Sequence, residues 1–114
     1  MRTIIAGSRN ITDMALLNQV MLKIDWKPTL ILCGRAHGVD WLGEQWAKAN
    51  SIALKYYPAQ WDKYGKMAGY LRNIQMAENA DALVALWDGK SKGTKHMIDI
   101  VTEKNLKIFV ETIR

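Results

Sequence analysis

The chain has 114 residues, of which 49% are hydrophobic, and it carries a formal net charge of +5 at pH 7. This composition excludes an intrinsically disordered chain, and the length predicts a single domain over residues 1–114. The only cysteine, Cys33, excludes a disulfide framework, and no apolar run reaches the ~20 residues of a membrane helix. Without a leader-like segment, these features predict a cytoplasmic protein with no membrane partner. The basic balance favours polyanionic partners but does not distinguish a mononucleotide from DNA.

The first half of the chain predicts two strand–helix units. An apolar run at residues 3–6 indicates a buried strand, and it is followed by a helix that Thr12 or Asp13 would cap. A second apolar run at 29–33 has no polar alternation, which is typical of a strand that is covered on both faces. Asp40 lies at the start of the next helical pattern, and we expect it to be the N-cap residue of that helix.

The second half repeats the alternation. Residues 52–57 partly alternate, as a half-exposed strand does, and residues 58–65 are expected to be a loop. A continuous apolar strand at 82–87 precedes a helix that Thr94 is expected to cap, and a last strand covers 106–110. The helix between these strands has four apolar residues at helical spacing, which we expect to face the core: Met67, Leu71, Ile74 and Ala77.

Five strands that alternate with four helices predict a Rossmann-like, doubly wound α/β fold with helices on both faces of a parallel sheet. The first, second and fourth strands are fully apolar and belong in the centre, whereas the third and fifth each contain a lysine and suit the edges. The predicted strand order is therefore 3-2-1-4-5. A ligand crevice is expected at the switch point between the first and fourth strands.

Three glycine-containing loops, at residues 7–9, 34–40 and 88–94, each connect a strand end to a helix start. In a parallel sheet such loops meet at one edge, where glycines let backbone N–H groups approach a ligand and helix N-termini favour anions. This arrangement predicts a nucleotide or phosphosugar site, although the third loop lacks the Gly-Lys-Ser/Thr ending of a P-loop. The predicted ligand-binding residues in these loops are Gly7, Ser8, Arg9, Gly34, Arg35, Gly38, Asp40, Asp88, Gly89, Ser91, Gly93 and Thr94.

Four further residues are predicted to bind the ligand. Arg72 and Asn73 lie on a second face of the third long helix, and Trp61 and Trp87 are placed to stack on a base or ribose. For each of these residues a structural role stays open: a solvated polar face for the helix pair, and core or dimer packing for the tryptophans. The histidines and the cysteine show no metal-ligand spacing, so neither a metal nor a cofactor is expected. Trp41 lies off the apolar stripe of its helix and favours a homo-oligomer.

The motifs of this chain are, in order, Gly7-Ser8-Arg9, Gly34-Arg35-Ala36-His37-Gly38-Val39-Asp40, Pro58-Ala59-Gln60-Trp61, Ala68-Gly69, Arg72-Asn73 with Met76, and Trp87-Asp88-Gly89 followed by Ser91-Lys92-Gly93-Thr94. Together they resemble the SLOG superfamily of SMF/DprA proteins and LOG phosphoribohydrolases, and within it the small YspA-like proteins of bacteria and phages, often labelled GTP-binding domains. The resemblance implies binding of a nucleotide or an ADP-ribose- or NAD-like ligand, for sensing or sequestration.

The resemblance also implies two alternatives: a hydrolase of nucleotide N-glycosidic bonds, and a single-stranded DNA binder of the DprA kind. The hydrolase branch uses an arginine on the third helix, which Arg72 matches as the candidate catalytic residue. It also uses a glutamate just after the Gly-Thr loop, and here Met97 stands in that place, with Asp99 two residues further on. A binding module is therefore expected rather than an enzyme, because general acid–base help is missing.

Overall fold

Five parallel strands form one sheet in the order β3-β2-β1-β4-β5, as the sequence predicts. The computed structural model describes residues 1–113. The elements are β1 (Arg2–Gly7), α1 (Met14–Lys23), β2 (Leu30–Cys33), α2 (Val39–Ala49), β3 (Ala53–Tyr56), α3 (Trp61–Tyr64), the 3-10 helix η1 (Gly65–Met67), α4 (Ala68–Glu78), β4 (Ala82–Trp87), α5 (Lys92–Glu103) and β5 (Lys107–Thr112). None of the helices within these residues is both long and apolar enough to span a membrane.

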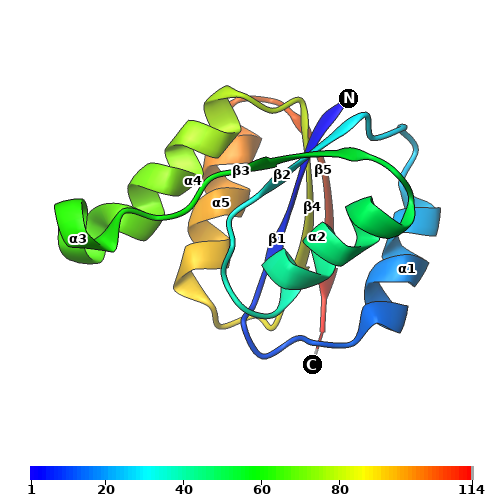
Figure 1. Ribbon diagram of the computed structural model, residues 1–114, viewed down its shortest axis with the longest axis horizontal. Helices are drawn as coiled ribbons and strands as arrows, with labels where there is room; N and C mark the ends of the chain where they lie inside the picture. The colour runs from blue at the N-terminus through cyan, green and yellow to red at the C-terminus, as the bar shows by residue number, and fades with distance from the viewer. Residues whose placement is uncertain (114) are drawn as a thin grey trace.

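Helices cover both faces of the sheet, with α1 and α2 on one side and α4 and α5 on the other (Figure 1). Each face has its own apolar core. Ile5 packs with Leu17 and Leu42 on the α1–α2 side, whereas the neighbouring Ile4 packs with Met97 on the α4–α5 side. Because successive strand residues point to opposite faces, a continuous apolar run is what a strand between two helical layers requires. The doubly wound, Rossmann-like α/β prediction is confirmed.

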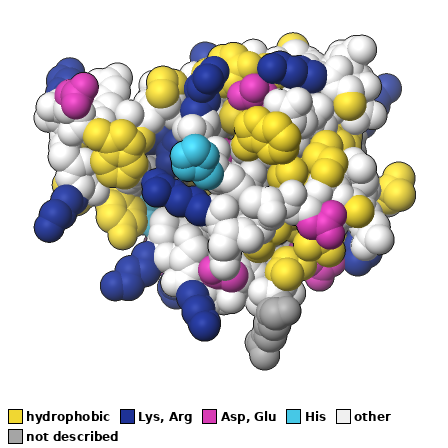
Figure 2. Space-filling view, turned by 60° about the horizontal axis from the view of Figure 1, so that its bottom comes forward, with side chains coloured by type: hydrophobic (Ala, Val, Ile, Leu, Met, Phe, Trp, Pro, Cys, Tyr) yellow, Lys and Arg dark blue, Asp and Glu magenta, His cyan; other side chains and the backbone are white. Residues whose placement is uncertain are grey.

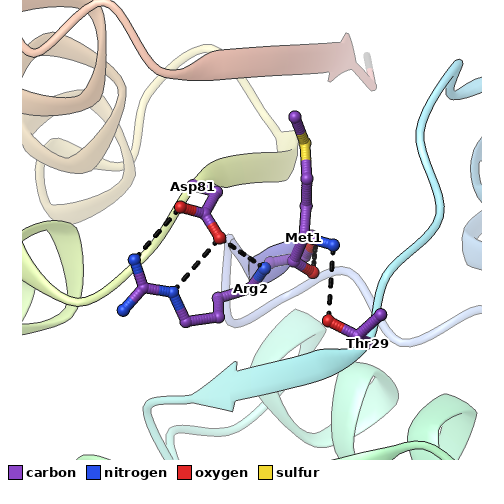
Figure 3. A network of polar contacts seen from close by, with 5 residues as sticks. Met1, Arg2, Thr29 and Asp81 are labelled. Atoms are coloured by element: carbon purple, nitrogen blue, oxygen red, sulfur yellow. Dashed lines mark hydrogen bonds and ion pairs between the residues drawn. The ribbon is translucent and has the colours of Figure 1, made fainter.

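Hydrogen bonds connect the amino ends of β1, β2 and β4, at the edge of the sheet opposite the glycine loops (Figure 3). The carboxylate of Asp81, just before β4, accepts hydrogen bonds from the Arg2 backbone N–H (2.8 Å) and from the Arg2 guanidinium (3.1 Å). These bonds hold the pKa of Asp81 below its ordinary value. The Met1 amino group donates to the Lys27 carbonyl at 2.9 Å and to the Thr29 hydroxyl at 3.3 Å. These contacts help to fix the register of the central strands, and therefore the relative positions of the loops at their carboxyl ends.

Two of the predicted helix caps are wrong. Asp13 caps α1 as expected, since its carboxylate accepts from the Ala15 N–H at 2.9 Å. However, α2 begins after Gly38, so Asp40 lies inside the first turn and its side chain turns back to the preceding loop. Ser91 rather than Thr94 caps α5, because the Ser91 hydroxyl accepts from the Thr94 N–H at 3.3 Å. Both errors have the same cause: another residue nearby could also start the helix.

The segment from 58 to 78 also differs from its prediction. The loop expected at 58–65 contains the short helix α3, and η1 begins at its last residue, Gly65; neither helix has a buried residue. On α4 the apolar pattern pointed to the wrong face, because Met67, Leu71 and Ile74 are exposed and only Ala77 of the expected four is buried. The face that packs on α5 instead includes a polar residue, Asn73, whose hydrogen bonds permit its burial.

Candidate functional site

A cavity of about 530 Å³ opens at the carboxyl edge of the sheet, between the loops that follow β1 and β4 and the helices α4 and α5. This is the switch point of the strand order, where ligands of doubly wound sheets bind, and the volume lies in the range of small-molecule sites. Figure 2 looks toward this edge and shows basic side chains and a histidine close together beside the protruding lobe that carries α3. The cavity brings together eleven of the predicted residues: Gly7, Ser8, Arg9, Asp40, Trp61, Arg72, Asn73, Asp88, Ser91, Gly93 and Thr94.

The Arg72 guanidinium reaches from α4 across to the loop after β2. Its Nη1 donates to the carbonyl oxygens of Gly34 and Tyr57, and its Nε donates to Asn73 Oδ1 at 3.1 Å. Burial lowers the pKa of Arg72, and the charge of Asp40 opposes that shift. Three bonds from one guanidinium fix its plane, so Arg72 presents a cation in a set orientation to the cavity.

Asp40 is the most buried carboxylate of the cavity, with 5% of its surface exposed. Its Oδ2 accepts from the Ala36 N–H at 3.2 Å. Burial raises the pKa of Asp40, and the positive charge of Arg72 opposes that shift. Gly34 separates the two charges: a Cβ there would lie 2.6 Å from Asp40 Oδ2 and closer still to Arg72 Nη1. A larger residue at position 34 would have to displace one of the two side chains, and within residues 1–113 no ion pair joins them.

The loop between β4 and α5 is organised by its own side chains. Asp88 Oδ1 accepts from the N–H groups of Lys90 and Ser91, both at 2.8 Å, and these bonds lower the pKa of Asp88. The Ser91 hydroxyl oxygen accepts hydrogen bonds from the backbone N–H and the hydroxyl group of Thr94. In the described part of the chain the amides of Lys92 and Gly93 have no acceptor, as is usual for the first turn of a helix.

Asn73 connects α4 to this loop. Its Nδ2 donates to the Gly93 carbonyl at 3.1 Å and lies 3.3 Å from His96 Nδ1, while its Oδ1 accepts from Arg72. The His96 ring packs edge-on against Tyr70, with the ring centroids 4.7 Å apart. Burial lowers the pKa of His96, which favours the neutral ring. One buried amide thus sets the position of Arg72 relative to the start of α5.

Comparisons with known proteins identify the family and the fold of the chain. The family model described as "YspA, cpYpsA-related SLOG family" matches residues 1–64, which is more than half of the chain. The chain belongs to this SLOG family. The Gene 61 protein of Mycobacterium phage D29 is 34% identical over 73 residues, which cover 59% of this chain and 58% of that protein. The crystal structure of DNA processing protein A (DprA) from Streptococcus pneumoniae superposes with a TM-score of 0.77 and 14% identity, over 96% of this chain and 49% of that chain. This structural likeness shows the fold.

Five predicted residues of this SLOG chain do not line the cavity but lie behind or beside it. Gly34 and Gly38 are buried beneath it, Arg35 is exposed and stacks on the Tyr56 ring, and Gly89 is exposed on the loop after β4. Trp87 is half-buried, and its indole N–H donates to the Ser91 carbonyl at 3.1 Å, so the ring supports the loop from outside the cavity.

Eight lining residues were absent from the predicted set of ligand-binding residues: Ala6, Asn10, Ala36, Lys66, Gly69, Tyr70, Met76 and Met97. For Lys66 and Tyr70 a signal was present, because they continue the Arg72–Asn73 face of the helix toward its amino end at spacings of three and four residues. Met97, which the family resemblance places where the hydrolase branch has its glutamate, is buried at the cavity wall. Asp99 does not replace it, because its carboxylate is exposed and pairs with Lys95 at 2.8 Å.

Proposed function

We propose that the cavity at the carboxyl edge binds a nucleotide or a nucleotide-derived molecule, such as a nucleoside phosphate or an ADP-ribose- or NAD-like compound. The role of this binding would be sensing or sequestration in the cytoplasm. The observation that carries the proposal is that one cavity contains a group for each part of such a ligand. It has a cationic and helix-terminal region, a buried carboxylate and an exposed aromatic ring.

The phosphate would lie between Arg9 and the start of α5. Arg9 is exposed at the end of β1, and the first-turn amides of α5 point an unsatisfied positive dipole end at the same cavity. Lys66 and Arg72 also line this cavity and add positive charge to it. The Asp88 carboxylate, although it lines the cavity, is already bonded to the Lys90 and Ser91 amides.

The ribose and the base would extend toward Asp40 and Trp61. A buried carboxylate accepts from vicinal hydroxyls more strongly than a neutral group does, because charge-assisted bonds are the stronger ones. The Trp61 ring is about half exposed, at 51%, and lies over Gly69, where the missing side chain leaves room beside the ring. A base stacked on the indole would cover apolar surface that otherwise faces water.

The test is a thermal-shift screen of the purified protein against AMP, GMP, ATP, GTP, NAD, ADP-ribose and cyclic ADP-ribose isomers. A ligand at ~100 times its dissociation constant should stabilise the protein by about 2.7 kcal/mol. Arg9→Ala should abolish most of the shift, whereas Arg35→Ala, an exposed arginine outside the cavity, is the matched control and should not. If no compound shifts the transition, or if the two variants behave alike, the proposal is wrong.

The same samples separate binding from hydrolysis. Mass spectrometry of the recovered ligand should find it intact, because the glutamate position is held by Met97 and Asp99 faces solvent. Recovery of the free base would instead support a hydrolase that acts through Arg72.

Single-stranded DNA is the second candidate ligand, favoured by the exposed aromatic and basic residues of the α3 region: Trp61, Lys63, Tyr64 and Lys66. Such binding would fall steeply with salt, because each neutralised phosphate releases a counterion. An oligonucleotide that binds tightly at low salt, with no response to any mononucleotide, would favour it.

A further inference from the structure

Exposed apolar side chains are concentrated on one part of the surface. Of the ten large apolar residues that are exposed in the described part of the chain, five lie between residues 61 and 74. Three of these form a stripe that runs from the end of η1 along α4 at spacings of four and three residues: Met67 (56% exposed), Leu71 (39%) and Ile74 (39%). In Figure 1, α4 lies against α5 on one side, and α3 extends beyond it at the end of the molecule. A helix face of this kind marks a contact surface rather than a solvated face.

A groove of about 340 Å³ lies beside the stripe. Its lining includes Pro58, Tyr64, Leu71 and Gln75. When two helices pack, side-chain ridges on each helix fit into grooves on its partner. A surface that has a ridge beside a groove therefore offers both halves of such a contact. Such a surface is complementary to itself when a second copy is related by a two-fold axis.

The charges at the ends of α4 point to the same partner. Glu78 is the last residue of α4, where the helix dipole is already negative, and within residues 1–113 it pairs with no cation. At the other end of the helix lie Lys63 and Lys66, both exposed. An antiparallel copy would bring each acidic end against a basic end and would oppose the two helix dipoles.

We propose that α4 is the interface of a homodimer, in which α4 of one copy packs antiparallel on α4 of a second copy. The two-fold axis would pass between Leu71 and Ile74, so that Leu71 of one copy faces Ile74 of the other. Glu78 would then lie opposite Met67 and within reach of Lys63. Arg72 lines both the groove and the large cavity, so the dimer covers the outer side of the candidate site.

Sedimentation equilibrium without added nucleotide tests the interface independently of the proposed ligand. The wild-type protein should have twice the 13.0 kDa chain mass at micromolar concentrations. Leu71→Glu and Ile74→Glu should each raise the dissociation constant at least 100-fold and leave the melting curve of the monomer sharp. Leu22→Glu is the matched control, because Leu22 on α1 is 87% exposed and lies outside the stripe.

A charge exchange tests the antiparallel geometry. Glu78→Lys and Lys63→Glu should each weaken the dimer several-fold, and the two together should restore it, because each copy again presents opposite charges. A wild-type protein that stays monomeric at the highest concentration reached would overturn the proposal. So would a dimer that Leu71→Glu leaves intact, or one that is broken instead by Trp41→Glu on α2.

Discussion

Asp40 is a buried carboxyl group whose charged form the folded protein disfavours. Because burial raises its pKa above the ordinary carboxyl value, the folded state keeps the proton longer than the unfolded state does. The free energy of unfolding should therefore fall as the pH rises from the ordinary carboxyl pKa through the raised one. Asp40→Asn should remove this dependence and stabilise the unliganded protein at neutral pH, while the two proteins become more alike in acid.

Urea unfolding of both proteins between pH 4 and pH 8 measures this difference. A variant less stable than the wild type at neutral pH would show that the attraction to Arg72 outweighs the burial of Asp40. In the binding screen the same variant should lose about 10- to 100-fold in affinity, which corresponds to a hydrogen bond to a charged group of about 1.5–3 kcal/mol. Higher stability with weaker binding is expected of a residue kept for its function.

Gly93 allows stability and binding to be separated in one substitution. A Cβ at this position would meet no described atom within 4 Å, and the residue lies in the first turn of α5. Gly93→Ala should therefore leave the fold as stable or stabilise it by about 0.4–1 kcal/mol. Because Gly93 lines the cavity, the new methyl group should hinder the approach of a phosphate to the helix amides, so affinity should fall at least tenfold. Lys92→Ala, on the same turn but outside the cavity, is the control; unchanged affinity in Gly93→Ala would place the anion elsewhere.

At the scale of the element, the start of α5 depends on Ser91. Its hydroxyl accepts from both the backbone and the side chain of Thr94. Ser91→Ala should cost about 1 kcal/mol, the usual loss on removal of an N-cap. Ser91→Thr keeps the acceptor and should cost much less. Thermal unfolding of the three proteins decides this, and equal losses in both variants would indicate that Ser91 contributes by packing rather than as a cap.

The elements around the cavity were harder to predict than the sheet. Leu71 and Ile74 of α4, with Met67 just before the helix, have the spacing of a core face, and the sequence alone does not reveal that this face is exposed. Asn73 can be buried because its side chain has hydrogen-bond partners, the Gly93 carbonyl and the Arg72 guanidinium. Gly93 lies 20 residues away in the sequence, so a local pattern does not reveal this contact. The residues of the strand-end loops were easier to predict, since parallel strands bring those loops to one edge whatever their side chains do.

At the scale of the whole molecule, the order of the strands was predictable because burial decides it. A strand with both faces apolar must lie between helical layers, and the lysines at 55 and 107 assign β3 and β5 to the edges. Which loop and helix residues line the cavity depends on the three-dimensional placement of their side chains, and hydrophobic patterning does not give this placement. That is why Trp87, which ends a central strand, supports the loop after β4 and does not line the cavity, whereas Tyr70 and Lys66 do.

The sheet order also predicts that the segment matched by the family model cannot fold by itself. Residues 1–64 contain β1, β2 and β3, but β4 lies directly beside β1, and the core on the α4–α5 side includes Leu83 and Met97. Without them, Ile4 and Leu32 would lose their packing partners and one whole face of the sheet would meet water. We expect the fragment 1–64 to show no cooperative thermal transition by far-ultraviolet circular dichroism, and the addition of the fragment 65–114 to restore one. A sharp transition in the first fragment alone would mean that the α1–α2 core suffices for folding, and that β4 contributes to the site more than to the stability of the sheet.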